Sequence, residues 1–443
     1  MLNRFASDYL DGIAGAAIGA SPRVAGRLAA CDGLLMEAVG LNVPVGTVCT
    51  VGEPGAGQVE AEAIGFRNGR TILMNLGGPA PLLPRALVRP TGTPGEAEVG
   101  AALLGRVVDG AGRPIDGLGP IRGAGRWPLA GTMQSPLDRG RVRQPLDVGV
   151  RAINGLLTIG QGQRVGIMAG SGVGKSVLLG MMVRAAEADV VVIGLIGERS
   201  REVADFLETK VAGEARKRSV VVAVPANHSP VLRIRGALRA TAIAESFRAE
   251  GKKVLLIMDS LTRVAHAGRE IGLALGEPAS ARGYPPSAIA MLPNLIERAG
   301  ADAHGTGSIT AIYTVLADGD DGNDPVVDSA RSILDGHIVL SRQLAERGVY
   351  PAIDLGPSVS RVMTDIAQPA HIRAARVLRR HLATYEENRD LILMGAYRPG
   401  ADPAIDKAMA YHPAVLDYIR QDADVPVSLD DAVTELTGVF FDE

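Results

Sequence analysis

The stretch AGSGVGKSV, residues 169–177, combines glycine, lysine and serine at a spacing that suits phosphate binding. Its alternating glycines permit tight turns whose backbone N–H groups can point at an anion. Lys175 can neutralise the β- and γ-phosphates, and the hydroxyl of Ser176 can ligate Mg²⁺. The positions expected to contact a bound nucleotide are Gly170, Ser171, Gly172, Val173, Gly174, Lys175, Ser176 and Val177.

Two further acidic residues each follow an apolar, strand-sized run. Asp259 ends VLLIMD, where a carboxylate can hold Mg²⁺ through water. Glu198 follows VVVIGLIG, so it can act as a general base or orient water for hydrolysis. Taken alone, GERSRE at 197–202 could equally begin a solvated helix.

The composition limits the class of protein. Of 443 residues, 47% are hydrophobic and 21% charged, and the formal net charge is -3, which is an ordinary globular balance. This charge gives no global attraction to nucleic acid or to an anionic membrane. We expect Cys31 and Cys49 to be buried, reduced thiols because their spacing fits no metal site. The start of the chain lacks the pattern of a signal peptide, and no apolar run is long enough to span a membrane, so we expect a cytoplasmic protein.

The rhythm of apolar residues changes along the chain. Residues 2–13 predict a short amphipathic helix, either packed on its own domain or docking to a partner or membrane surface. Short β-like pieces over 24–88 predict a β-barrel. Strand-sized runs, among them 253–259 and 308–316, then alternate with helical stretches such as 200–215 and predict a mostly parallel sheet covered on both faces. The segment after Pro369 is helical in period. The expected domains are 1–20, a docking helix; 21–95, a β-barrel; 96–365, a nucleotide-binding domain; and 366–443, a helical domain.

Several motifs together resemble one family. AGSGVGKS, GERSREV, MDSLTR, GYPPS, SILDGHIVLSR and VYPAIDLGPSVSRVM, in this order, are similar to the rotary ATP synthase catalytic subunits and the type III secretion export ATPases. The resemblance covers roughly residues 24–420. It is strongest to the flagellar branch, with which Ala169 agrees, since rotary catalytic subunits usually have glycine there.

The resemblance implies a RecA-type α/β fold and roles for further residues. Lys175 and Ser176 would bind phosphate and Mg²⁺, and Glu198 would activate the attacking water. Arg199 and Arg263 would contact the γ-phosphate. The remaining implied roles are Asp259 and Glu202 in the Mg²⁺ shell, Tyr350 stacked on adenine, and Arg361 as an arginine finger given to a neighbouring subunit.

The resemblance also implies partners. We expect a homohexamer that uses ATP and Mg²⁺ and associates peripherally with the inner membrane at the export apparatus. The expected partners are a stator-like regulator, a central stalk protein, chaperone–substrate complexes and the membrane export gate.

Three alternatives remain open at this point. The first is the ATPase of a virulence type III secretion system, which shares nearly every motif. The second is a Rho-like RNA translocase, to which the basic stretch of Arg233, Arg235 and Arg239 could point; we expect these arginines to face solvent on a helix and expect no nucleic-acid partner. The third is a non-catalytic ring subunit, disfavoured by Glu198.

Overall fold

A computed structural model describes residues 24–53, 57–78, 81–91, 95–132, 135–303, 306–316 and 324–440. The chain divides between Gly95 and Glu96 into two compact units, and each is described by itself. The helix predicted over 2–13 lies outside the described residues. No helix among the described residues is both long and apolar enough to cross a membrane.

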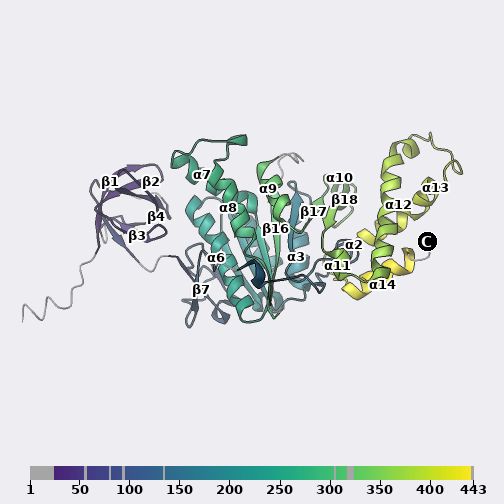
Figure 1. The fold of residues 1–443 in the computed structure, drawn as a ribbon, viewed down its shortest axis with the longest axis horizontal. Helices are drawn as coiled ribbons and strands as arrows, with labels where there is room; N and C mark the ends of the chain where they lie inside the picture. Colours follow the sequence, from purple (N-terminus) through teal and green to yellow (C-terminus); the bar gives the residue numbers. More distant parts are fainter. Residues whose placement is uncertain are drawn as a thin grey trace, which may run out of the picture. The chain divides into compact units, whose positions relative to one another are not determined.

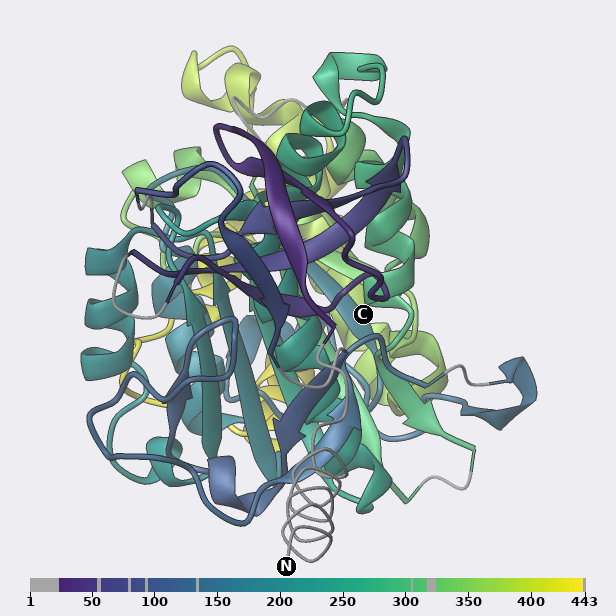
Figure 2. The same ribbon diagram turned by 90° about the vertical axis from the view of Figure 1, so that its left-hand side faces the viewer.

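The first unit is a closed antiparallel barrel, as the sequence predicts (Figure 2). Its strands follow the order β1-β2-β5-β4-β3-β6, and β6 pairs with β1 to close it. They are β1 Gly26–Asp32, β2 Leu35–Val39, β3 Val48–Val51, β4 Val59–Arg67, β5 Arg70–Asn75 and β6 Leu87–Pro90.

Alternate residues along the barrel strands face the interior and fill it with apolar side chains, as β3 shows. Along β3, Cys49 and Val51 point inward and are fully buried, whereas Val48 and Thr50 are only partly covered. Cys49 therefore fits the expectation of a buried thiol, and burial raises its pKa to about 11. Cys31 is also a free thiol but is exposed, so the expectation of burial was wrong for it, because β1 presents its second half to solvent.

The second unit is built on a large sheet in the order β18-β17-β11-β16-β14-β12-β13-β8. The pairs from β17 to β8 are parallel, and β18 runs antiparallel to β17. Off this order, β15 pairs antiparallel with the start of β16 and with β10. The strands are β8 Val107–Val108, β10 Arg139–Gly140, β11 Arg164–Ala169, β12 Val190–Ile196, β13 Ser219–Val224, β14 Lys253–Asp259, β15 Gly300–Asp302, β16 Ser308–Leu316, β17 Gly336–Leu340 and β18 Ile353–Ser360. A separate ribbon pairs β7 Glu96–Val99 with β9 Gly125–Pro128.

Helices cover both faces of this sheet, which explains why its central strands are apolar throughout (Figure 1). One face carries α6 Pro230–Ala249, α7 Leu261–Ala274, α8 Pro286–Ile296 and α9 Pro325–Ile333. The other packs against α2 Arg151–Leu156, α3 Lys175–Ala185, α4 Ser200–Thr209 and α5 Glu214–Lys217.

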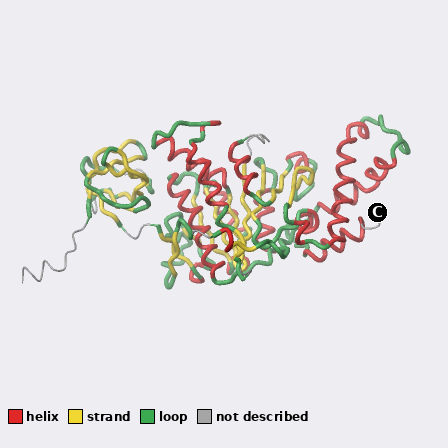
Figure 3. The backbone as a smooth tube through the Cα atoms, in the orientation of Figure 1, coloured by secondary structure: helices red, strands yellow, loops and turns green. Residues whose placement is uncertain are grey.

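The C-terminal segment is helical, as predicted (Figure 3). It follows α10 Arg342–Glu346 and consists of α11 Met363–Ile366, α12 Pro369–Leu393, α13 Pro403–Ile419 and α14 Leu429–Phe440. Arg151 at the start of α2 ties it to the sheet by donating to the carbonyls of Asp417 and Tyr418 and to the carboxylate of Glu435. These bonds give the helices a fixed anchor at one end of the nucleotide-binding sheet.

Two local predictions were wrong. The run predicted as one helix over 200–215 divides into α4 and α5, because Gly213 adopts a φ of 60° between them. Arg233, Arg235 and Arg239, predicted to face solvent, are between 3% and 7% exposed. Two of the guanidinium groups form bonds within the protein. Arg233 pairs with Glu270, and Arg239 donates to the carbonyls of Gly110 and Ala111. They therefore form no basic surface for RNA.

A buried ion pair fixes the β7–β9 ribbon to α6. Glu245 is 1% exposed and accepts two hydrogen bonds from Arg298, at 2.9 and 2.8 Å. The indole of Trp127 on β9 donates to the same carboxylate at 3.0 Å. Each polar atom of this carboxylate is thus satisfied, which buried charges require.

We expect Glu245→Ala to lower the free energy of unfolding by about 3–5 kcal/mol, because Arg298 would stay buried without its counter-charge. Urea denaturation followed by circular dichroism measures this. The control is Glu214→Ala, which should cost less than about 1 kcal/mol, because this side chain is 86% exposed and its ion pair is with the exposed Lys217. Equal losses for the two variants would contradict the assignment.

Candidate active site

Parallel strands deliver the key side chains to one edge of the sheet. The loop of residues 170–174 follows β11, Glu198 follows β12 by one glycine, and Asp259 is the last residue of β14. Because these strands run parallel, their carboxyl ends meet at the same edge. The structure therefore brings together three groups that are far apart in the sequence.

The glycine-rich loop has the backbone that its sequence requires. Gly172 and Gly174 have φ values of 80° and 88°, a region that side chains other than glycine rarely adopt. Helix α3 begins directly afterwards at Lys175, so its first N–H groups lie beside the loop. Ser171, Ser176 and Val177 are exposed, whereas Val173 is buried and anchors the loop in the core.

Lys175 lies between the two carboxylates. Its Nζ is 2.5 Å from Oδ1 of Asp259 and 3.6 Å from Oε1 of Glu198. Asp259 is 4% exposed, so the pair sits where water screens charge weakly. The same Oδ1 accepts a hydrogen bond of 2.6 Å from the hydroxyl of Thr314 on β16.

The surroundings of Glu198 disfavour its ionised form. Burial raises its pKa, the negative charge of Asp259 raises it further, and Lys175 opposes both. Its Oε1 has no hydrogen-bond partner among the described residues. A buried carboxylate oxygen that no hydrogen bond satisfies, 3.6 Å from the ammonium of Lys175 and next to a phosphate loop, fits a group that binds and activates water.

Arg263 reaches the same region from the first turn of α7, whose N-cap Ser260 accepts from its backbone N–H. Its side chain crosses Gly197 so closely that a Cβ on that glycine would lie 2.6 Å from Cβ of Arg263. Gly197 also has a φ of 75°. Nε of Arg263 is buried and has no hydrogen-bond partner within the described part of the chain, which leaves it available to a ligand.

The ring of Tyr350 lies beside the phosphate loop. A Cβ on Gly174 would be 3.5 Å from Cδ1 and Cε1 of Tyr350, and the tyrosine is 47% exposed. Its carbonyl accepts from the backbone N–H of Gln421, which joins it to the C-terminal segment. An exposed aromatic ring at this place fits stacking on a base.

Arg199 and Glu202 lie at the start of α4 and pair with each other at 2.9 Å. Arg199 is 84% exposed, and Glu202 contributes to the raised pKa of Glu198. Their predicted roles at the γ-phosphate and in the Mg²⁺ shell stay predictions.

Arg361 lies at the opposite edge of the sheet. It follows β18, whose last residue, Ser360, pairs with Gly336 at the start of β17. The phosphate loop leaves β11 beyond Ala169, which pairs with Leu340 at the other end of β17. Leu340 comes four residues after Gly336, which is about 13 Å at the rise of a strand. Arg361 is exposed, and its guanidinium donates to the carbonyl of Arg331.

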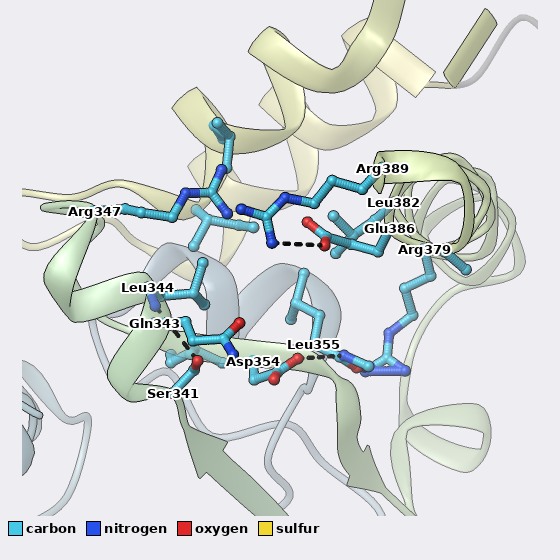
Figure 4. Close-up of a pocket in the computed structure, with 15 residues that line it drawn as sticks. Ser341, Gln343, Leu344, Arg347, Asp354, Leu355, Arg379, Leu382, Glu386 and Arg389 are labelled. Atoms are coloured by element: carbon cyan, nitrogen blue, oxygen red, sulfur yellow. Dashed lines mark hydrogen bonds and ion pairs between the residues drawn. The ribbon is translucent and has the colours of Figure 1, made fainter. Parts of the chain in front are cut away.

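A cavity of about 440 Å³ lies between β18, α10 and the C-terminal helices (Figure 4). Leu344, Leu355 and Leu382 give it an apolar lining, and Arg347 and Arg389 lie across it from Asp354. Burial is the main cause of the raised pKa of Asp354. The phosphate loop contributes no side chain to this cavity.

Comparison with known proteins agrees with this geometry. Residues 149–360 match the nucleotide-binding domain of the ATP synthase alpha/beta family, and residues 367–438 match the C-terminal domain of the type III secretion ATPase EscN. The flagellum-specific ATP synthase of Pseudomonas aeruginosa is 51% identical over 95% of this chain and 94% of its own length. The chain belongs to the ATP synthase alpha/beta family.

Other members of the family resemble it along nearly its whole length. The type 3 secretion system ATPase of Pseudomonas syringae pv. tomato is 44% identical over 94% of each chain. The assembled ATPase EscN of enteropathogenic Escherichia coli superposes with a TM-score of 0.88 and 41% identity, over 94% of this chain and 100% of that one. EscN has also been solved in complex with its central stalk EscO. This chain, like these relatives, is an ATPase.

Sequence reasoning missed Gly197 and Thr314. Gly197 precedes Glu198 in GERSRE, and a glycine at the end of a strand is a signal that another group packs closely against the backbone there. Thr314 gave no signal within SITAIYTVL, because a threonine in an apolar strand is ordinary and only the sheet order places it beside Asp259.

We expect Gly197→Ala to lower turnover about a hundred-fold, since the added Cβ would displace Arg263 and the backbone that carries Glu198. Steady-state ATPase assays measure it. Gly213→Ala is the matched control, because Gly213 also has a positive φ but nothing lies within 4 Å of the added Cβ. Comparable turnover in both variants would show that the crowding at Arg263 is unimportant.

Proposed function

We propose that this family member hydrolyses MgATP to energise type III protein export for flagellum assembly. The observation that carries the proposal is the convergence of Lys175, Asp259 and Glu198 at one edge of the sheet. Non-catalytic nucleotide sites need the lysine and the loop but have no need of a buried glutamate poised for water. The identity to the flagellar relative supports the choice of export system.

The residues present fit a Mg²⁺–nucleotide complex. Ser176 and Asp259 would hold the ion, which when bound neutralises phosphate charge. Lys175 binds the phosphates, Tyr350 stacks on adenine, and Glu198 takes a proton from the attacking water. Catalysis of this kind depends mainly on positioning and on electrostatic stabilisation of the transferring phosphoryl group.

Arg361 supports assembly into a ring. Its place at the far edge of the sheet separates it from the phosphate loop of its own subunit. An arginine finger at that position can serve only a neighbouring subunit. The solved assembly of EscN supports a homohexamer. In such a ring each chain would contribute both a catalytic site and a finger.

The remaining partners belong to the same proposal. A stator-like regulator would bind the N-terminal segment, a central stalk would occupy the pore, and chaperone–substrate complexes would dock near the C-terminal helices. The ring would then sit peripherally at the inner membrane beside the export gate. The solved complex of EscN with its central stalk supports the stalk partner.

We expect Glu198→Gln to bind ATP normally and to lose about 10²–10⁴-fold in turnover, because the amide keeps the shape but cannot accept the proton of water. Lys175→Ala should instead weaken nucleotide binding itself. Fluorescent-nucleotide titration and ATPase assays separate the two effects. Turnover at the wild-type rate in Glu198→Gln would remove the basis of the proposal.

The pH dependence should report the same glutamate. Its raised pKa means that it takes up a proton at a higher pH than the ordinary carboxyl value of about 4.3. Since only the ionised form accepts a proton from water, kcat/KM should fall as the pH is lowered through this raised value. A profile that stays flat down to the ordinary carboxyl range would contradict the role of Glu198.

The export system is tested in the organism that encodes the chain. Cells in which Glu198→Gln replaces the wild type should secrete no flagellar subunits. Cells that carry Glu187→Gln, a change at an exposed residue of the loop between α3 and β12, should secrete them normally. If flagellar export continued while virulence effectors were lost, the ATPase would belong to a virulence secretion system instead.

A further inference from the structure

Thr314 occupies a distinctive place in the sheet. It lies on β16, the strand between β11, which carries the phosphate loop, and β14, which ends at Asp259. Its side chain is fully buried, with 0% exposure. No role assigned above to substrate, metal or water uses it.

The hydroxyl of Thr314 makes one strong interaction. Oγ1 is 2.6 Å from Oδ1 of Asp259 and 3.4 Å from the carbonyl oxygen of Met258. A hydroxyl has a single proton to donate, and the shorter contact to an ionised acceptor takes it. Thr314 therefore donates to the carboxylate of Asp259.

This bond fixes one end of the carboxylate. Oδ1 of Asp259 accepts hydrogen bonds from the hydroxyl of Thr314 and from Nζ of Lys175. Among the described side chains at this site, none donates a hydrogen bond to Oδ2. The torsion that sets the carboxylate plane is broad and roughly two-fold when nothing holds it. Thr314 removes this freedom from a buried position that ligand binding need not disturb.

Lys175 cannot supply the same restraint throughout the reaction. Its ammonium has three donors and a flexible stem, and the proposed function directs it towards the substrate phosphates. The hydroxyl of Thr314 is carried by a central strand and has no such second task. When the lysine serves the nucleotide, Thr314 is the group that still orients Asp259.

We propose that Thr314 is a positioning residue that sets the orientation of Asp259 for Mg²⁺ and thereby controls the Mg²⁺-dependent part of nucleotide binding. This inference rests on the proposed function of Asp259. It predicts an effect that appears only when Mg²⁺ is present, which distinguishes it from a general role in packing.

Thr310 offers a matched control on the same strand. It lies four residues earlier and so faces the same side of the sheet, and it is 2% exposed. Its Oγ1 also makes one hydrogen bond, accepting at 2.9 Å from the backbone N–H of Gly162. Thr310→Val and Thr314→Val thus remove one buried hydroxyl each, but only the second touches Asp259.

The test measures binding of a fluorescent ATP analogue to the full chain, with free Mg²⁺ titrated and with EDTA. For Thr314→Val we expect the Mg²⁺ concentration at half-maximal effect to rise about ten-fold or more, in line with a hydrogen bond to a charged group. Affinity in EDTA should stay within about two-fold of wild type. Thr314→Ser, which keeps the hydroxyl, should restore most of the Mg²⁺ response, and Thr310→Val should titrate as wild type.

A Mg²⁺ titration of Thr314→Val that matches wild type would overturn the inference, and so would an equal shift in Thr310→Val. Circular dichroism before titration confirms that each variant is folded. If the valine variant is not, Thr314→Ala, which also lacks the hydroxyl, takes its place in the same titration. If Thr314→Val behaves as wild type while Glu198→Gln is inactive, only this inference fails. If Glu198→Gln is fully active, the proposed function fails first.

Discussion

The active site depends on one buried interaction, the ion pair between Lys175 and Asp259. The two residues belong to strands that are not neighbours, since β16 lies between β11 and β14. The pair therefore forms only when all three strands are in register and the glycine-rich loop brings Lys175 to the end of β14. A lysine and an aspartate buried together are stable only as a pair, so the sheet order and the site specify each other.

Elements around the sheet place further groups near this edge. Gly197 lets Arg263 pass close to the backbone before Glu198, and the backbone of Gln421 in the C-terminal segment holds the carbonyl of Tyr350. The C-terminal helices are themselves attached to α2 through Arg151, whose backbone N–H donates to the side chain of the same Gln421. Groups that would contact the phosphates, the base and the attacking water thus come from different elements tied to one rigid sheet.

Much of this could be predicted from the sequence. The apolar run 253–259 and the run 308–316 are the strands β14 and β16 with the predicted bounds, because buried parallel strands are apolar throughout. The loop of AGSGVGKS was recognisable because glycine, lysine and serine have few other reasons to stand at that spacing. The barrel and the helical C-terminal segment were predicted from their periods.

What the sequence could not give are contacts decided by tertiary packing. The charge pattern of a helix does not show what packs against it, so the sequence predicts that the arginines of α6 face solvent. In the structure they are buried, and they bond to Glu270 and to backbone carbonyls. The restraint on Asp259 by Thr314 depends on strand order, which a local window does not contain. The far-edge position of Arg361 likewise follows only from the antiparallel pairing of β17 with β18.

The central claim is that one chain supplies both a catalytic site and the finger for its neighbour. It is tested most directly by mixing two inactive variants, Glu198→Gln and Arg361→Ala, and measuring ATP hydrolysis. A mixed ring contains interfaces in which an intact glutamate site meets an intact arginine, so part of the activity should return. If the two variants co-assemble by sedimentation and no activity returns at any ratio, the account of a finger acting between subunits is contradicted.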